Sequence, residues 1–141
     1  MTDAAIGFGS KFERSSDGTS AGIFATVAQM RDIPFPEVSR DIIDGTHMES
    51  PDGYREFVPG LADGGELSLE MLFKSGGTGY TTLLADFHSA APGYYKITLV
   101  GGDTFEFSGF VKGLSGTAPL ADAMTATVTI KITGKPIYTK I

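Results

Sequence analysis

Few residues in this 141-residue chain could do acid–base or metal chemistry. Its two histidines, His47 and His88, are the natural candidates for general bases or metal ligands. Asp86 lies two residues before His88, but on the helix expected here side chains at that spacing do not face each other. His47 has Asp44 and Glu49 beside it, which would make a poor metal site of two carboxylates and one imidazole. Neither histidine therefore predicts a catalytic or metal centre.

Other patterns of catalytic sites are missing or incomplete. The absence of cysteine excludes disulfides, thiolate zinc sites, iron–sulfur clusters and cysteine nucleophiles. Two glycine-rich segments, residues 7–10 and 76–79, lack the Gly-Lys-Ser/Thr ending of a phosphate-binding loop. Glu66 and Glu70 fall on one exposed strand face, where nothing would desolvate them and tune their pKa values. We therefore predict that the protein is not an enzyme and has no cofactor and no bound metal.

The negative net charge of the chain argues against a surface that binds nucleic acid. Seventeen acidic and 11 basic residues give a net charge of −6, whereas phosphate binding depends on lysine and arginine. Nine of the acidic residues and two arginines lie between positions 32 and 66, so this quarter carries −7 and the remainder +1. No apolar run approaches the ~20 residues of a membrane helix, and the first residues lack the features of a signal peptide. We expect one soluble, intracellular domain.

Alternating apolar and polar residues predict that most of the chain is β-sheet. The clearest strand covers residues 124–133, in which threonines share the exposed face. A glycine turn at 101–103 joins two more strands into a hairpin. One helix is expected at 78–89, where apolar residues recur at helical spacing. The two strands of this hairpin cover residues 94–100 and 104–114, and the remaining predicted strands cover residues 23–30, 38–43 and 66–73.

These elements predict an α+β domain that is mainly β, a β-sandwich or barrel with one flanking α-helix and a long loop. The loop is the segment 44–65, the longest without clear periodicity, and it combines acidic with aromatic residues. A solvated loop is one interpretation; a segment that becomes ordered against a partner is the other. The same periodicity predicts the core residues: Leu67, Leu69, Met71, Leu83, Phe87, Phe105, Phe107, Val128 and Ile130.

The order of several segments resembles one known family. A glycine-led strand at 65–73 is followed by a helix containing residues 83–87 and then by strands at 95–99 and 104–116. The most characteristic part is Phe-x-Gly-x-Val-x-x-Leu at 107–114, a threonine-rich strand, and Gly-x-Pro at 134–136. Over about residues 20–137 the chain resembles the major tail tube proteins of long, non-contractile-tailed bacteriophages, the lambda-like siphophage family.

This resemblance implies a structural virion protein with a single tail-tube domain over residues 1–141. Such proteins assemble into hexameric rings that stack into the tail tube, which holds the tape-measure protein and lets DNA pass to the host without specific binding. It further implies tail-tip and tail-terminator proteins as partners, no membrane contact, and a place in the virion tail after assembly in the host cytoplasm.

The resemblance also implies three segments that bridge subunits and rings. These are an N-terminal arm at 1–10, the long inter-subunit loop at 44–65 and a C-terminal tail at 135–141. The acidic, aromatic loop is the candidate for the stacking surface. Its expected contact residues are Asp44, Met48, Glu49, Asp52, Tyr54, Arg55, Glu56, Phe57 and Asp63.

Two alternatives remain open at the level of the sequence. The same fold would serve as the tube subunit of a secretion system or of a phage-derived bacteriocin. A monomeric β-barrel that binds a small apolar ligand in its interior would have a similar pattern of strands. Large side chains on the apolar faces argue against such a cavity.

Overall fold

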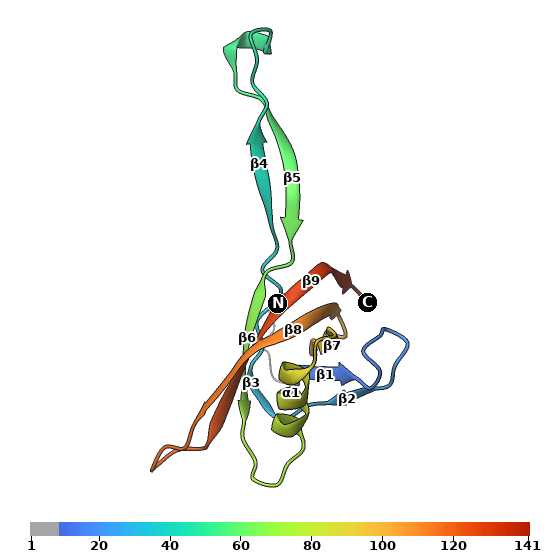
Figure 1. Ribbon diagram of the computed structural model, residues 1–141, viewed down its shortest axis with the longest axis vertical. Coiled ribbons are helices and arrows are strands. Elements are labelled where there is room, and N and C mark those ends of the chain that lie inside the picture. The colour runs from blue at the N-terminus through green and yellow to red at the C-terminus, as the bar shows by residue number, and fades with distance from the viewer. Residues whose placement is uncertain (1–8) are drawn as a thin grey trace, which may run out of the picture.

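The computed structural model describes residues 9–141, which form a curled β-sheet, one flanking α-helix and a long two-stranded hairpin that projects from them (Figure 1). The elements, in chain order, are β1 Lys11–Ser15, β2 Phe24–Thr26, β3 Met30–Asp32, β4 Ser39–Asp44, the short 3-10 helix η1 Pro51–Gly53, β5 Phe57–Asp63, β6 Glu66–Leu72, α1 Gly79–His88, β7 Gly93–Thr98, β8 Thr104–Thr117 and β9 Thr125–Thr139. No helix within residues 9–141 has the length and apolar character needed to cross a membrane.

Seven strands form one antiparallel sheet in the order β2-β1-β7-β8-β9-β6-β3. Strands β2 and β3 are consecutive in the chain, with three residues between them, yet lie at opposite edges of this sheet. Within that link Val27 N–H donates to Phe12 O of β1, and Gln29 O accepts from Leu72 N–H of β6. The sheet therefore curls until its edges approach each other. The predicted mainly β fold with one flanking helix is confirmed.

The core fills the inside of the curled sheet. Alternate residues of β6 and β9 point inward, and rings of Phe12 and Tyr95 stack with their centroids 5.5 Å apart. The helix contributes Leu83, which is fully buried. Seven of the residues expected in the core are buried: Leu67, Leu69, Met71, Leu83, Phe107, Val128 and Ile130.

Two expected core residues lie elsewhere. Phe105 is only partly buried, packed against the core and 4.9 Å from the ring of Tyr138. Phe87 is 43% exposed, because the last turn of α1 directs Asp86 to the sheet instead. Asp86 accepts two hydrogen bonds of 2.6 Å from the guanidinium of Arg14 and one of 2.7 Å from the hydroxyl of Tyr95. A polar contact thus fixes the end of the helix where the sequence predicted an apolar one.

Segments expected to be irregular are partly strands. Within the predicted loop at 44–65, residues Phe57–Asp63 form strand β5, which pairs with β4, whereas residues 45–56 connect the two strands. The expected C-terminal tail at 135–141 lies in β9 as far as Thr139, and Tyr138 donates its hydroxyl hydrogen to Asp103 over 2.7 Å. Strand β1 follows the expected N-terminal arm at 1–10, of which residues 1–8 lie outside the described residues.

Candidate inter-subunit surfaces

The β4–β5 hairpin is the most exposed apolar part of the described chain. Strands β4 and β5 pair only with each other, from Ser39 opposite Asp63 to Asp44 opposite Phe57. Figure 1 shows the hairpin standing away from the rest of the molecule. Side chains on both of its faces are half or more exposed: Val38 just before it and Ile42, Ile43, Met48, Tyr54, Phe57, Val58 and Leu61 within it.

The hairpin has the physical features of an interaction surface. An isolated two-stranded ribbon is marginally stable at best in water, and an apolar patch of this extent is typical of an interaction surface. The hairpin is also acidic: residues 39–63 carry six aspartates and glutamates and two arginines, a net charge of −4. The surface therefore suits a partner with an apolar groove and some positive charge.

The root of the hairpin is fixed to the sheet. Asp63 accepts a 2.9 Å hydrogen bond from Gly65 N–H and pairs with Lys131 of β9 over 2.9 Å, and these contacts lower the pKa of Asp63. Gly65 has φ +85°, and a Cβ there would collide with the carbonyl oxygen of Glu37. Only glycine therefore allows the two arms of the hairpin to approach this closely where they leave the sheet.

The tip of the hairpin, residues 45–56, is ordered by its own hydrogen bonds. His47 Nδ1 accepts the backbone N–H of Glu49 over 3.1 Å, and its Nε2 lies 3.2 Å from a carboxylate oxygen of Glu56. Hydrogen bonds from Thr46 lower the pKa of Asp44. Both nitrogens of His47 thus have protein partners, and no cluster of three potential metal ligands occurs within residues 9–141.

The nine contact residues expected from the sequence all lie on this hairpin. Most of them surround the tip, whereas Asp63 lies at the root in its ion pair with Lys131. Ile42 and Ile43 on the arm are also exposed, although the sequence predicted only an ordinary strand there and no contact residues. Two adjacent apolar residues in one strand point to opposite faces, and this pattern in the sequence was a signal that both faces of the hairpin carry apolar side chains.

A second surface is the outward face of β6, β9 and β8, which is rich in hydroxyl groups. Ser68 and Thr129 lie 3.3 Å apart across β6 and β9, and Thr117 and Thr125 lie 3.4 Å apart across β8 and β9. Lysines on this face are paired with carboxylates, as in the 3.2 Å contact of Lys112 with Glu66. Hydroxyls and neutralised lysines give this face little excess positive charge.

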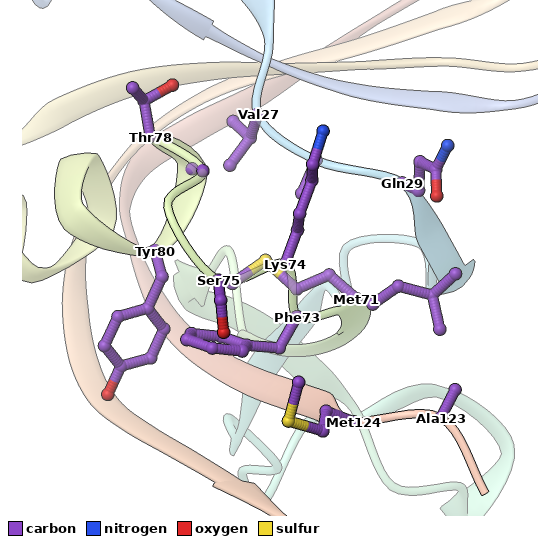
Figure 2. A pocket seen from close by; sticks show the side chains of 14 residues that line it. Val27, Gln29, Met71, Phe73, Lys74, Ser75, Thr78, Tyr80, Ala123 and Met124 are labelled. Atoms are coloured by element: carbon purple, nitrogen blue, oxygen red, sulfur yellow. The ribbon is translucent and has the colours of Figure 1, made fainter. Parts of the chain in front are cut away.

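A third feature is a groove of about 630 Å³ at the far end of β6 (Figure 2). It lies between the β2–β3 link, the end of β6, the segment leading into α1 and the start of β9. Phe73 and Tyr80 meet edge to face in its wall, with ring centroids 5.4 Å apart. Met124, the residue just before β9, is partly exposed there.

One sequence pattern that resembles a catalytic motif lies in an ordinary loop. Residues 18–22 match the spacing Gly-x-Ser-x-Gly of a nucleophile elbow. They connect strand β1 to strand β2, whereas an elbow turns from a strand directly into a helix. Ser20 is exposed in this loop and is not held at such a turn.

Residues 8–139 match the family model described as lambda phage tail tube protein. The chain belongs to this family. The resemblance predicted from the residues is therefore confirmed, and the protein is a structural component of the tail of a phage or phage-like particle rather than an enzyme. No curated protein sequence matches the chain.

Several solved structures of low sequence identity share the fold of this family member. One comes from the tail of an empty gene transfer agent particle refined with C6 symmetry, with a TM-score of 0.76, 17% identity, and coverage of 97% of this chain and 100% of that one. A sheath/tube terminator chain of an extracellular contractile injection system has a TM-score of 0.73, 12% identity and 97% coverage of both chains. The SPP1 tail tube has a TM-score of 0.62 and 10% identity, with coverage of 92% of this chain and 75% of that one.

Proposed function

We propose that this tail tube protein assembles into hexameric rings, and that the rings stack into a tube through which DNA is delivered to the host. The observation that carries the proposal is the β4–β5 hairpin, which exposes apolar side chains on both faces of an otherwise compact domain. Further copies of the same chain would cover such a surface in a tube. The C6 symmetry of the structurally similar gene transfer agent tail supports six subunits per ring.

In the proposed tube the hydroxyl-rich face of β6, β9 and β8 lines the lumen. DNA adheres to proteins mainly where lysine and arginine neutralise its phosphates. On this face Lys112 and Lys131 are paired with carboxylates, and the residues between them are largely serine and threonine. A wall of this kind would let DNA slide without specific binding.

The proposed tube has a lumen and two ends, and each of these would bind a different partner protein. A tape-measure protein would occupy the lumen during assembly, and tail-tip and tail-terminator proteins would bind its two ends. Similar folds occur in a sheath/tube terminator structure of an injection system and in the tube-terminating cap of the anti-feeding prophage, which supports end-binding partners of related shape. Assembly would take place in the host cytoplasm, before the tube becomes part of the virion tail. The segments 1–10 and 135–141 are proposed to bridge neighbouring subunits.

A second candidate function is the tube of a contractile injection or secretion apparatus. The fold is shared with the tube chains of an extracellular contractile injection system, at a TM-score of 0.69 for a sheath–tube complex. Such a tube would bind a sheath on its outer surface. A monomeric ligand-binding barrel is not supported, because Phe12, Tyr95 and Phe107 fill the interior of the sheet.

Negative-stain electron microscopy of the purified full chain tests the proposal. Stacked rings with a central hole are expected as the protein concentration rises, with salt added to screen the acidic surface. A matched variant replaces residues 41–61 by Asn-Gly, which closes the hairpin between Arg40 and Ala62. This variant is expected to stay folded and to form no stacks. A wild-type chain that remains monomeric at every concentration and salt level would contradict the proposal.

A further inference from the structure

The groove near α1 lies at the end of the domain opposite the hairpin. Strand β5 continues through Gly64 and Gly65 into β6, so hairpin and groove are joined by one nearly continuous stretch of chain along the long axis (Figure 1). The hairpin lies at the start of this stretch and the groove at its other end, beside Met71 and Phe73. Each subunit therefore carries a projecting apolar element at one pole and an apolar recess at the other.

The groove is built to hold apolar side chains. Its walls are formed mainly by Val27, Ala28, Met71, Phe73, Tyr80 and Met124. Phe73, Tyr80 and Met124 also line an adjoining hollow of about 350 Å³ next to β8, so the recess extends on both sides of these three residues. A groove of about 630 Å³ with a hollow of about 350 Å³ beside it has room for more than one side chain.

The charge at the groove is opposite to that of the hairpin tip. Lys74 is the one charged residue among the lining residues that the structure describes, and its side chain extends between Val27 and Gln29 (Figure 2). The hairpin tip, residues 45–56, contains Glu49, Asp52 and Glu56 against Arg55, a net charge of −2. Opposite charges at the rim of an apolar contact favour encounter and fix the register.

We propose that the tip of the β4–β5 hairpin of one copy binds in this groove of the copy stacked on it, with Met48 and Tyr54 entering the apolar recess and the acidic residues facing Lys74. The inference rests on the proposed tube function. Both tip side chains are among the most exposed apolar groups of the chain. Because the two halves of the contact lie at opposite poles, each bound copy presents a new hairpin and a new groove, as an open stack requires.

Cysteine pairs test the contact directly, because the natural chain contains no cysteine that could interfere. One preparation carries Met48→Cys and the other carries Ala123→Cys in the groove. Tubes assembled from an equal mixture and mildly oxidised are expected to yield a disulfide-linked dimer on a non-reducing gel. The matched control replaces Ala123→Cys by Leu120→Cys, a fully exposed position three residues away that does not line the groove. Equal linkage to both positions, or none to Ala123→Cys in well-formed tubes, would overturn the inference.

A charge reversal gives an independent readout if a cysteine variant fails to fold. Lys74→Glu places a like charge opposite the tip and is expected to raise the critical concentration for tube formation about twofold to fivefold. Adding Glu49→Lys on the hairpin should restore assembly. A Lys74→Glu variant that assembles like the wild type would overturn the inference. Loss of tubes already in the wild type would instead refute the proposed function, so the two failures are distinguishable.

Discussion

Replacing Ile42 and Leu61 by serine should weaken tube assembly and leave the fold of the subunit intact. In the subunit these hairpin side chains are 62% and 86% exposed, so the folded domain gains little from them. Full burial of an isoleucine or leucine stabilises by about 1.5–3 kcal/mol, and scaling by the exposed fractions gives about 2–4 kcal/mol for the pair. This loss per subunit corresponds to a critical concentration about 30- to 1,000-fold higher.

Two measurements check this prediction. Sedimentation of assembled tubes over a range of protein concentrations gives the critical concentration. Urea unfolding of the unassembled subunit, followed by circular dichroism, gives the stability of the fold. Leu120→Ser is the matched control, because Leu120 is equally apolar and fully exposed but lies on the turn between β8 and β9.

Either of two results would refute the reasoning. An unchanged critical concentration would show that no neighbour covers the arms of the hairpin. A fall in the free energy of unfolding of the isolated subunit by about 2 kcal/mol or more would show that Ile42 and Leu61 stabilise their own domain, in conflict with their exposure.

Three further variants probe the core, the lumen and the buried tyrosine. Val128→Asp with Ile130→Asp should give insoluble protein, because both side chains are fully buried and a buried unpaired carboxylate is costly; soluble, folded protein on a sedimentation assay would argue against the core assignment. Thr127→Lys with Thr129→Lys should slow DNA ejection from particles built with the variant, and unchanged kinetics would place the lumen wall elsewhere. Burial raises the pKa of Tyr95 above its ordinary value of about 10. The unfolded chain therefore releases this proton first as the pH rises, and stability that is present below about pH 10 is lost above it. Urea unfolding between pH 8 and 11.5 should show a shallower alkaline loss in Tyr95→Phe, and the same slope in both proteins would contradict the effect.

The strands that the sequence predicted best are those with one face in the core. In β6 and β9, inward residues such as Leu69 and Val128 alternate with outward ones such as Ser68 and Thr129, because the inside of the sheet is apolar and the outside is wet. An alternation of apolar and polar residues can be detected in a sequence only when one face of the strand is buried and the other is exposed.

In the hairpin arms both faces are exposed and both carry apolar residues. The sequence of β5 therefore does not alternate, which explains why it resembled a loop. Neither face of β4–β5 packs on the domain, so Phe57 and Val58 occur side by side and Pro59 and Gly60 follow within the same strand. Pro59 is tolerated because a two-stranded ribbon has edges on both sides. Apolar residues on both faces of the hairpin remove the alternation by which a strand is recognised in a sequence.

Other differences came from tertiary contacts that have no local signal. Strand β1 has a single apolar residue that is buried, Phe12, and its place in the sheet depends on pairing with β7 far along the chain. The helix contact through Asp86 depends on Arg14, 72 residues away. The candidate groove likewise combines three separate segments of the chain, residues 27–29, 71–80 and 123–124, and periodicity within any one of them does not reveal it.

The direct continuation of β5 into β6 also determines how the subunit would respond to mechanical force. Tension applied to the hairpin along the tube axis passes through Gly64 and Gly65 into β6 and reaches β9 through seven consecutive residue pairs, from Glu66 opposite Lys131 to Leu72 opposite Thr125. Because the pull is parallel to the strands, these hydrogen bonds are loaded together in shear and do not open one after another. The same connection that projects the hairpin would therefore make the domain resist being pulled apart when the tail bends.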